Sequence, residues 1–275
     1  MALLPVSEAL RRILDSAATL PSESVGLLAA RGRTLAEAIT SKVDNPPFDA
    51  SAMDGYAVRS EDVATVPVTL TVVGEAGAGR PFTDTLRKRQ AVRIFTGGIL
   101  PPGADAIVIQ ENTTASGSEV TVLETAQRDA NVRTRGQDFA AGEVLVEPGR
   151  LLTARDVLIS ASAGYAELSV ARKPVVAILS TGDELVAPGE PLGPGQISGS
   201  NAYGLSGVVE AAGGEARFLG IARDSLASLD EFISAAEDAD VLVTSGGASV
   251  GDHDLVRPAL EKAGAQLDFY KIAMR

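Results

Sequence analysis

Apolar runs and helical segments alternate along the chain from Pro174 onward. Strands are predicted at 175–179, 216–221, 241–243 and 267–272, and helices near 201–212, 226–237 and 254–263. This alternation predicts a mostly parallel, doubly wound sheet, because consecutive parallel strands need crossover connections. Ligands of such sheets bind outside the carboxyl ends of the strands, so the site is expected at the turns that follow them. Those turns are 180–184, 223–224 and 245–251.

The segment 241–254 is the strongest candidate for a binding site. It reads as an apolar strand, a glycine-rich turn with two hydroxyl groups, and two aspartates before a helix. Glycines let backbone N–H groups approach a phosphate, the helix presents its positive end, and carboxylates hold a hard cation. The segment therefore predicts an anion site with a metal beside it. The alternative is an ordinary strand-to-helix turn, in which Gly and Asp are also common.

Composition restricts the chemistry of that site. The chain has no Cys and one His, His253, which excludes a Cys-His or Ser-His-Asp catalyst and any thiolate or multi-histidine metal centre. With 36 acidic and 24 basic side chains, the net charge of −12 argues against nonspecific binding to nucleic acid or anionic membranes. A phosphorylated ligand remains compatible with this charge if a cation reverses the local field.

We expect a cytoplasmic protein. The N-terminus lacks the basic start and apolar core of a signal peptide, and no apolar run reaches 18 residues. The length of 275 residues favours about two domains.

The N-terminal segment is predicted to be helical. Ser7 is expected to cap a first helix, and a second helical pattern runs over 25–39 with an interruption at Gly32. The pattern ends before Pro46 and Pro47, because consecutive prolines lack amide donors and fix an extended backbone.

The middle of the chain is predicted to be a compact β domain. Short alternating runs separated by Gly, Pro, Asp and Asn fill the region from Met53 to Val146; they are 66–73, 90–94, 106–109 and 119–123. After them, Thr153 is expected to cap a helix and Gly164 to stop it.

These patterns predict an α/β plus β chain that is elongated and has three parts. Residues 1–44 and 140–172 form a discontinuous helical stalk, and residues 45–139 form an inserted β domain. Residues 173–275 form the doubly wound domain.

Three motifs resemble those of one known family. They are Asp-Ala-Ser-Ala-Met-Asp-Gly-Tyr-Ala at 49–57, Ser-Thr-Gly-Asp-Glu-Leu at 180–185 and Thr-Ser-Gly-Gly-Ala-Ser-Val-Gly at 244–251. Together they resemble the MoeA family, the molybdopterin molybdenumtransferases, whose animal relative is part of gephyrin. The likeness extends over essentially the whole chain. The Ser-Ala-Met-Asp-Gly-Tyr element is the most specific, whereas Thr-Ser-Gly-Gly is shared with smaller molybdopterin-binding proteins.

The resemblance implies that molybdate is inserted into adenylylated molybdopterin with Mg²⁺, releasing AMP and the molybdenum cofactor. It makes the doubly wound domain the molybdopterin-binding one. Candidate catalytic residues are Asp54, Thr96, Asp138 and Glu184. Candidate ligand-binding residues are Thr181, Gly182, Asp183, Ser245, Gly246, Gly247, Ser249, Gly251 and Lys271. Candidate Mg²⁺ ligands are Asp224 and Asp254, with Asp252 as a weaker third.

The sequence departs from the family pattern in two places. Gly199 stands where the family usually has an aspartate before a Ser/Thr-Asn pair. The family continues beyond the position of Arg275, so we expect the third domain to be incomplete at its C-terminus. Lys271 and Arg275 match two of the family's basic positions.

The resemblance also implies a homodimer with an active site shared between chains. Asp54, Thr96 and Asp138 belong to the β insert, whereas Glu184 and Asp224 belong to the doubly wound domain. A head-to-tail pair of chains would bring each insert to the partner's sheet. Two alternatives remain, namely a noncatalytic molybdopterin-binding scaffold protein and a molybdopterin adenylyltransferase.

Overall fold

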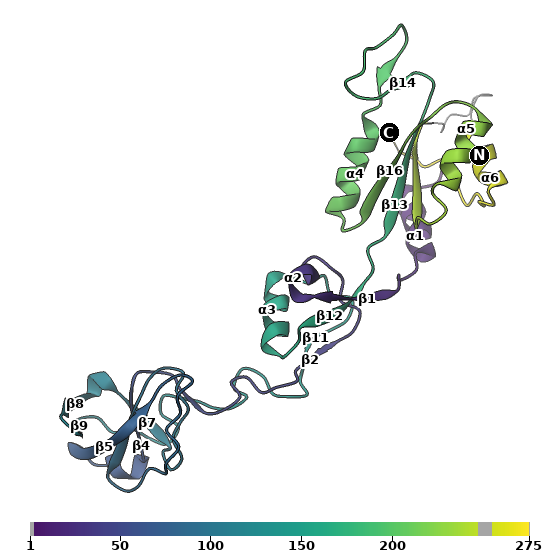
Figure 1. Cartoon of the computed structure of the whole chain (residues 1–275). Helices are drawn as coiled ribbons and strands as arrows, with labels where there is room; N and C mark the ends of the chain where they lie inside the picture. The colour runs from purple at the N-terminus through teal and green to yellow at the C-terminus, as the bar shows by residue number, and fades with distance from the viewer. Residues whose placement is uncertain (1–2, 247–254, 275) are drawn as a thin grey trace. The chain divides into compact units, whose positions relative to one another are not determined.

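The computed structural model describes residues 3–246 and 255–274 and divides the chain into two compact units. Unit 1 comprises 1–24, 32–36 and 169–275, and unit 2 comprises 25–31 and 37–168. Figure 1 traces the elements of both. In the described residues, no helix is long and apolar enough to cross a membrane.

A parallel sheet with helices on both faces forms the body of unit 1 (Figure 1). Its strands β13 (Val175–Thr181), β16 (Glu215–Ala222) and β17 (Val241–Ser245) lie in the order β16-β13-β17. Helix α4 (Asn201–Ala211) packs on the face that contains Ile178, whereas α5 (Leu226–Ser234) and α6 (Val256–Lys262) pack on the face that contains Leu179. Ile178 and Leu179 are fully buried. The doubly wound sheet predicted from the sequence is therefore confirmed.

The ladder between β13 and β16 contains a bulge. Ile178 pairs with Phe218 and Leu179 with Gly220, so Leu219 is an extra residue in β16. Gly220 has a φ of +123°, a conformation that side-chain-bearing residues rarely adopt. Regular pairing then resumes and ends with Thr181 opposite Ala222.

The fourth strand predicted for unit 1, at 267–272, is wrong. This segment forms only an isolated bridge, in which Leu4 donates to the carbonyl of Lys271 and accepts from the N–H of Ala273. Leu4 therefore occupies backbone groups of this segment that a neighbouring strand of the sheet would need for pairing. Leu267 is also 49% exposed, so the run does not supply a buried strand.

The N-terminal helix is present, but its predicted cap is wrong. Helix α1 (Val6–Ser16) follows Pro5, whose carbonyl accepts from Glu8 and Ala9, and Ser7 lies inside the helix. Proline suits this position because its φ is already helical and it has no N–H to satisfy. Two arginines of the helix, Arg11 and Arg12, hydrogen-bond the Glu8 carboxylate and lower the pKa of Glu8 to about 2.

The helix predicted over 25–39 is also wrong for most of its length. The segment contains the end of β1 (Ser22–Gly26), a single helical turn α2 (Leu27–Ala30) and the start of β2 (Ile39–Thr40). Gly32 adopts a φ of +77°, which turns the chain out of the helix. Leu35 then lies in extended backbone opposite Val170 and is buried.

A six-stranded sheet forms the β module of unit 2, in the order β7-β4-β6-β5-β9-β8. Its strands are β4 (Gly55–Val58), β5 (Val68–Ala76), β6 (Gln90–Ile94), β7 (Ala106–Ile109), β8 (Thr113–Ser116) and β9 (Glu119–Val122). Both faces are covered by apolar side chains, one around Val58 and the other around Ala57. The compact β region that the alternating runs predict is therefore present.

Short elements complete the described chain. They are 3₁₀ turns at Ser60–Val63 and Gln110–Asn112, and the strand pairs β3 (Ala50–Ser51) with β10 (Val132–Arg133), β2 with β11 (Val144–Val146), β1 with β12 (Glu167–Ala171), and β14 (Leu185–Val186) with β15 (Ile197–Ser198).

Helix α3 (Ala154–Ser162) begins and ends as the sequence predicts. Thr153 forms a capping box, in which its side chain accepts from the N–H of Asp156 and the Asp156 carboxylate accepts from the N–H of Thr153. Gly164 has a φ of +90° just after the helix. Asp156 is 4% exposed, and its carboxylate also pairs with Arg150.

We predict that Thr153→Ala lowers the free energy of unfolding of the protein by about 1 kcal/mol, because the N-cap acceptor is lost and the buried Asp156 loses a donor. Urea denaturation followed by circular dichroism measures the change. Thr153→Ser keeps the oxygen and serves as the control. Equal stability of the Ala and Ser variants would contradict this role of the cap.

Candidate functional site

The carboxyl ends of β13, β16 and β17 bring three turns of unit 1 together. Because Thr181 pairs with Ala222 and Ser180 pairs with Ser245, the residues that follow each strand emerge side by side. This is the edge at which doubly wound sheets bind ligands.

Two of these turns are joined by reciprocal hydrogen bonds. The N–H of Asp183 donates to Oδ2 of Asp224 over 3.4 Å, and the N–H of Asp224 donates to Oδ1 of Asp183 over 3.3 Å. Arg223 donates from Nη1 to the carbonyl of Asp183 over 3.1 Å. Each carboxylate thus keeps one oxygen outside these bonds, on side chains that are exposed. The arrangement offers carboxylate oxygens to a cation or to a polar ligand.

Glycines allow the chain to pass closely at this edge. Gly246 has a φ of +106°, and a Cβ there would lie 2.3 Å from the carbonyl oxygen of Thr181. Gly182 has a φ of +146°, and a Cβ there would lie 2.4 Å from Oε2 of Glu184. A larger residue at Gly246 would collide with the backbone of Thr181 at the end of β13, whereas one at Gly182 would be strained by the positive φ and would displace the Glu184 side chain of its own turn.

Hydroxyl groups line the same edge. Thr181 is 3% exposed, and its Oγ1 is buried without a hydrogen-bond partner among the described residues. Ser245 accepts a 2.8 Å hydrogen bond at Oγ from Nδ2 of Asn201. Because a buried hydroxyl without a partner is costly, Thr181 marks a place where a polar partner is expected.

A small cavity of about 110 Å³ lies between the ends of β13 and β17 and the start of α4. Its lining carries no charged side chain and combines polar with apolar residues; it consists of Ser180, Leu185, Ile197, Ser198, Gly199, Ser200, Asn201 and Ser245. Gly199 contributes no side chain to this lining. A Cβ at Gly199 would lie 3.2 Å from Cδ1 of Ile221.

Four of the predicted residues lie outside the described residues. They are Gly247, Ser249, Gly251 and Asp254, together with the weaker candidate Asp252. Lys271 is exposed and lies in the segment that bridges to Leu4. No interaction between described residues joins its side chain to the three turns.

The remaining candidates lie in the β module of unit 2, where Asp54 and Thr96 meet. The N–H and the hydroxyl of Thr96 both donate to Oδ1 of Asp54, each over 2.8 Å. These bonds, with a smaller contribution from the positive charge of Arg93, lower the pKa of Asp54. Asp54 is therefore held in its ionised form as an acceptor.

Arg93 supports this pair from the adjacent strand. Its guanidinium lies 5.1 Å from the ring centre of Tyr56 and 4.9 Å from that of Phe95, and it donates to the carbonyl of Gly55 and to Oε1 of Gln110. These contacts fix the positive charge beside the turn that contains Asp54.

Asp138 pairs with Arg133, which donates to both carboxylate oxygens over 2.8 and 2.7 Å. Arg133 lies in β10 opposite Ala50, and the next residue of β3, Ser51, bonds the backbone of Gly97 and Gly98. The ion pair with Arg133 and the backbone contacts of β10 and β3 therefore connect Asp138 to the Thr96 turn in unit 2. Arg93, Arg133 and Arg223 can be read from the sequence, but only the structure reveals their hydrogen-bond partners.

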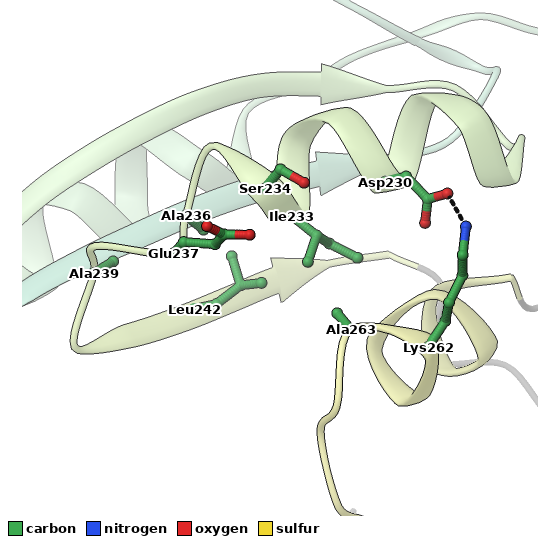
Figure 2. Close-up of a pocket in the computed structure, with 9 residues that line it drawn as sticks. All are labelled: Asp230, Ile233, Ser234, Ala236, Glu237, Ala239, Leu242, Lys262 and Ala263. Carbon is green, nitrogen blue, oxygen red and sulfur yellow. Dashed lines mark hydrogen bonds and ion pairs between the residues drawn. The ribbon is translucent and has the colours of Figure 1, made fainter.

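A larger hollow of unit 1, of about 470 Å³, contains none of the candidate residues (Figure 2). It lies between α5, α6 and the first residues of β17, where Asp230 and Lys262 form an ion pair and Leu242 supplies an apolar wall. Its cation is already paired and its other lining is mostly Ala and Ile. The candidate residues of unit 1 are therefore found at the strand ends and not in this hollow.

Two family models match consecutive parts of this chain. A family model described as the MoeA N-terminal region, domains I and II, matches residues 4–164. A second, described as a probable molybdopterin binding domain, matches residues 177–275.

Two curated relatives are both named molybdopterin molybdenumtransferase. The protein of Nostoc sp. is 43% identical over 259 residues, which cover 92% of this chain and 59% of the relative. The protein of Haemophilus influenzae is 41% identical over 256 residues, which cover 92% of this chain and 63% of the relative. The chain thus spans about three fifths of the length of these relatives.

A solved structure has the same fold. A molybdopterin biosynthesis MoeA protein from Pyrococcus horikoshii superimposes with a TM-score of 0.83 at 37% identity, covering 95% of this chain and 67% of that protein.

We predict that Thr96→Val raises the pKa of Asp54 toward its ordinary value, because the carboxylate loses the hydroxyl donor and keeps the backbone one. NMR titration of the Asp54 side-chain carbon measures the shift. Thr96→Ser retains the donor and should leave the pKa low. An unchanged pKa in the valine variant would show that the hydroxyl does not stabilise the charged form.

Proposed function

The chain belongs to the MoeA family, and on this premise we propose that it inserts molybdate into adenylylated molybdopterin and releases AMP. The observation that supports the proposal most strongly is the pair of hydrogen-bonded turns at the carboxyl ends of β13 and β16. These turns contain Asp183, Glu184 and Asp224, and the buried hydroxyl of Thr181 lies at the start of the first turn. Such an edge can bind a polar phosphorylated ligand without a side-chain nucleophile.

We assign distinct roles to the residues of the two units. Thr181, Gly182 and Asp183 with Ser245 and Gly246 bind polar edges of the substrate in unit 1, and Glu184 orients a polar group there. In unit 2, Thr96 keeps Asp54 charged, and Asp138 is oriented by Arg133. All are hydrogen-bonding and electrostatic roles, as expected for a chain without Cys.

Mg²⁺ is proposed as the metal of the reaction, with Asp224 as its ligand in the described part of the chain and Asp254 as a second ligand outside it. The donor type fits, because Mg²⁺ takes one or two carboxylates and completes its shell with water and substrate oxygens. Asp224 keeps Oδ1 available, since its bond to Asp183 uses Oδ2. Bound Mg²⁺ would neutralise charge on the phosphates.

A homodimer with a shared active site is proposed because the candidate residues fall into two sets, one in each unit. In a two-fold dimer, the unit 1 residues of one chain would face the unit 2 residues of its partner, and the reverse would hold at the second site. The cytoplasmic location predicted from the sequence stays a prediction. The comparisons favour neither the scaffold nor the adenylyltransferase alternative.

Incubation of the purified protein with adenylylated molybdopterin, molybdate and Mg²⁺ tests the function. We predict AMP release that Asp224→Asn reduces by tenfold or more, while stability changes by less than about 1 kcal/mol, because the amide oxygen still accepts from Asp183. Asp238→Asn, at an aspartate that pairs with Arg217, is the matched control. Wild-type protein that consumes ATP with free molybdopterin would support the adenylyltransferase instead, and tight binding without turnover would support the scaffold.

Complementation tests the shared site. We predict that Asp54→Asn and Asp224→Asn are each inactive alone, and that subunit exchange restores activity, because a mixed dimer contains one site with both defects and one with neither. Random pairing of equal amounts should recover about a quarter of wild-type activity. The experiment measures AMP release after heterodimers have been demonstrated by mass spectrometry. Heterodimers without recovery would place both residues in one chain's site.

A further inference from the structure

Arg223 differs from the other arginines of unit 1 in its bonding. Of the seven arginines of unit 1 that the structure describes, six form ion pairs with Asp or Glu; these six are Arg11, Arg12, Arg33, Arg172, Arg217 and Arg257. Within the described part of the chain Arg223 forms no ion pair, and its side chain bonds only the carbonyl of Asp183.

This bonding is unexpected because two aspartates, Asp183 and Asp224, lie close to Arg223. Asp224 is its neighbour in the chain, and Asp183 supplies the carbonyl that Arg223 binds. Instead, the carboxylate of each aspartate accepts a hydrogen bond from the backbone N–H of the other aspartate. The hydrogen bonds between the two turns therefore join aspartate carboxylates to backbone N–H groups. The Arg223 guanidinium takes no part in them.

The guanidinium has capacity for a further ligand. It carries five N–H donors in a planar fork, of which the described structure uses one at Nη1. The side chain is exposed at the carboxyl edge of the sheet, and its own backbone N–H is fixed by Oγ of Ser228 over 3.1 Å. A fixed backbone with a free fork is suited to bidentate binding of an oxyanion.

Charge explains why an oxyanion needs this arginine. Asp183, Glu184 and Asp224 are acidic, and the whole chain has a net charge of −12. An anionic ligand at these strand ends is repelled unless a local cation compensates. Among the described residues of the three turns, Arg223 is the one basic side chain.

We propose that Arg223 binds a phosphate oxyanion at the carboxyl edge of the sheet, and so selects a phosphorylated ligand over its unphosphorylated counterpart. The identification of that oxyanion with the phosphate of the adenylyl group rests on the proposed function. Binding of the Asp183 carbonyl positions the fork between the two turns.

Calorimetric titration of the purified chain with AMP, adenosine and inorganic pyrophosphate, each with Mg²⁺ present, tests the proposal. We expect AMP to bind at least about tenfold more tightly than adenosine, and Arg223→Gln to remove that difference. Arg223→Lys should keep part of it, because charge is retained and the fork is lost. Arg217→Gln, which changes an arginine within β16 that is paired with Asp238, should bind AMP as the wild type does. Thermal denaturation checks that the Arg223 variants remain folded.

The outcomes separate this proposal from the proposed function. AMP binding that is unchanged in Arg223→Gln overturns the role of Arg223 and leaves the function intact. Pyrophosphate binding that depends on Arg223, without any preference for AMP over pyrophosphate, supports the oxyanion site and contradicts the adenylyl assignment. If adenosine and AMP bind equally to the wild type and pyrophosphate does not bind, the oxyanion site is refuted. Loss of folding in Arg223→Gln with normal folding and full affinity in Arg223→Lys shows a structural role and also refutes it.

Discussion

The parallel register of β13 with its two neighbours is the constraint on which the candidate site of unit 1 depends. Hydrogen bonding fixes Thr181 opposite Ala222 and Ser180 opposite Ser245, so three turns from distant parts of the sequence emerge at one edge. No single side chain could impose this arrangement. The buried residues Ile178 and Leu179, packed between helices on opposite faces, make a register shift costly because it would exchange the faces of the sheet.

The parts of the fold that the sequence predicted correctly are those in which one short-range pattern decides the structure. The run 175–179 is apolar throughout, which suits a strand covered on both faces, and Thr153 with Asp156 forms a cap within four residues of chain. The segment 25–39 failed because its apolar spacing is helical, whereas the positive φ of Gly32 and the pairing of Leu35 with Val170 are tertiary features. The run 267–272 failed because its backbone partner, Leu4, lies at the other end of the sequence.

In the candidate site, too, some features could be predicted from the sequence and others depend on tertiary contacts. Strand topology alone brings Asp183 close to Asp224, since both follow adjacent strands. The motif resemblance named Asp54 and Thr96, which the structure joins through two hydrogen bonds. The contrast between Arg223 and Arg217 could not be predicted, because both are arginines in or just after β16 and differ in which acceptors the fold presents to them.

The bulge at Leu219 shifts the pairing register of β16 by one residue. Before it, the residue opposite Ile178 is Phe218; after it, the residue opposite Leu179 is Gly220, so successive pairs of β13 skip one residue of β16. A strand of the same sequence with unbroken pairing would place Arg223 and Asp224 one step further from the end of β13 and turn each toward the opposite face. The order of charges at the edge of the sheet therefore depends on Gly220, three residues before Arg223, whose backbone conformation other residues rarely adopt. Insertions in the exposed loops of this domain would leave the faces to which Arg223 and Asp224 point unchanged. A single residue gained or lost within β16 would exchange those faces.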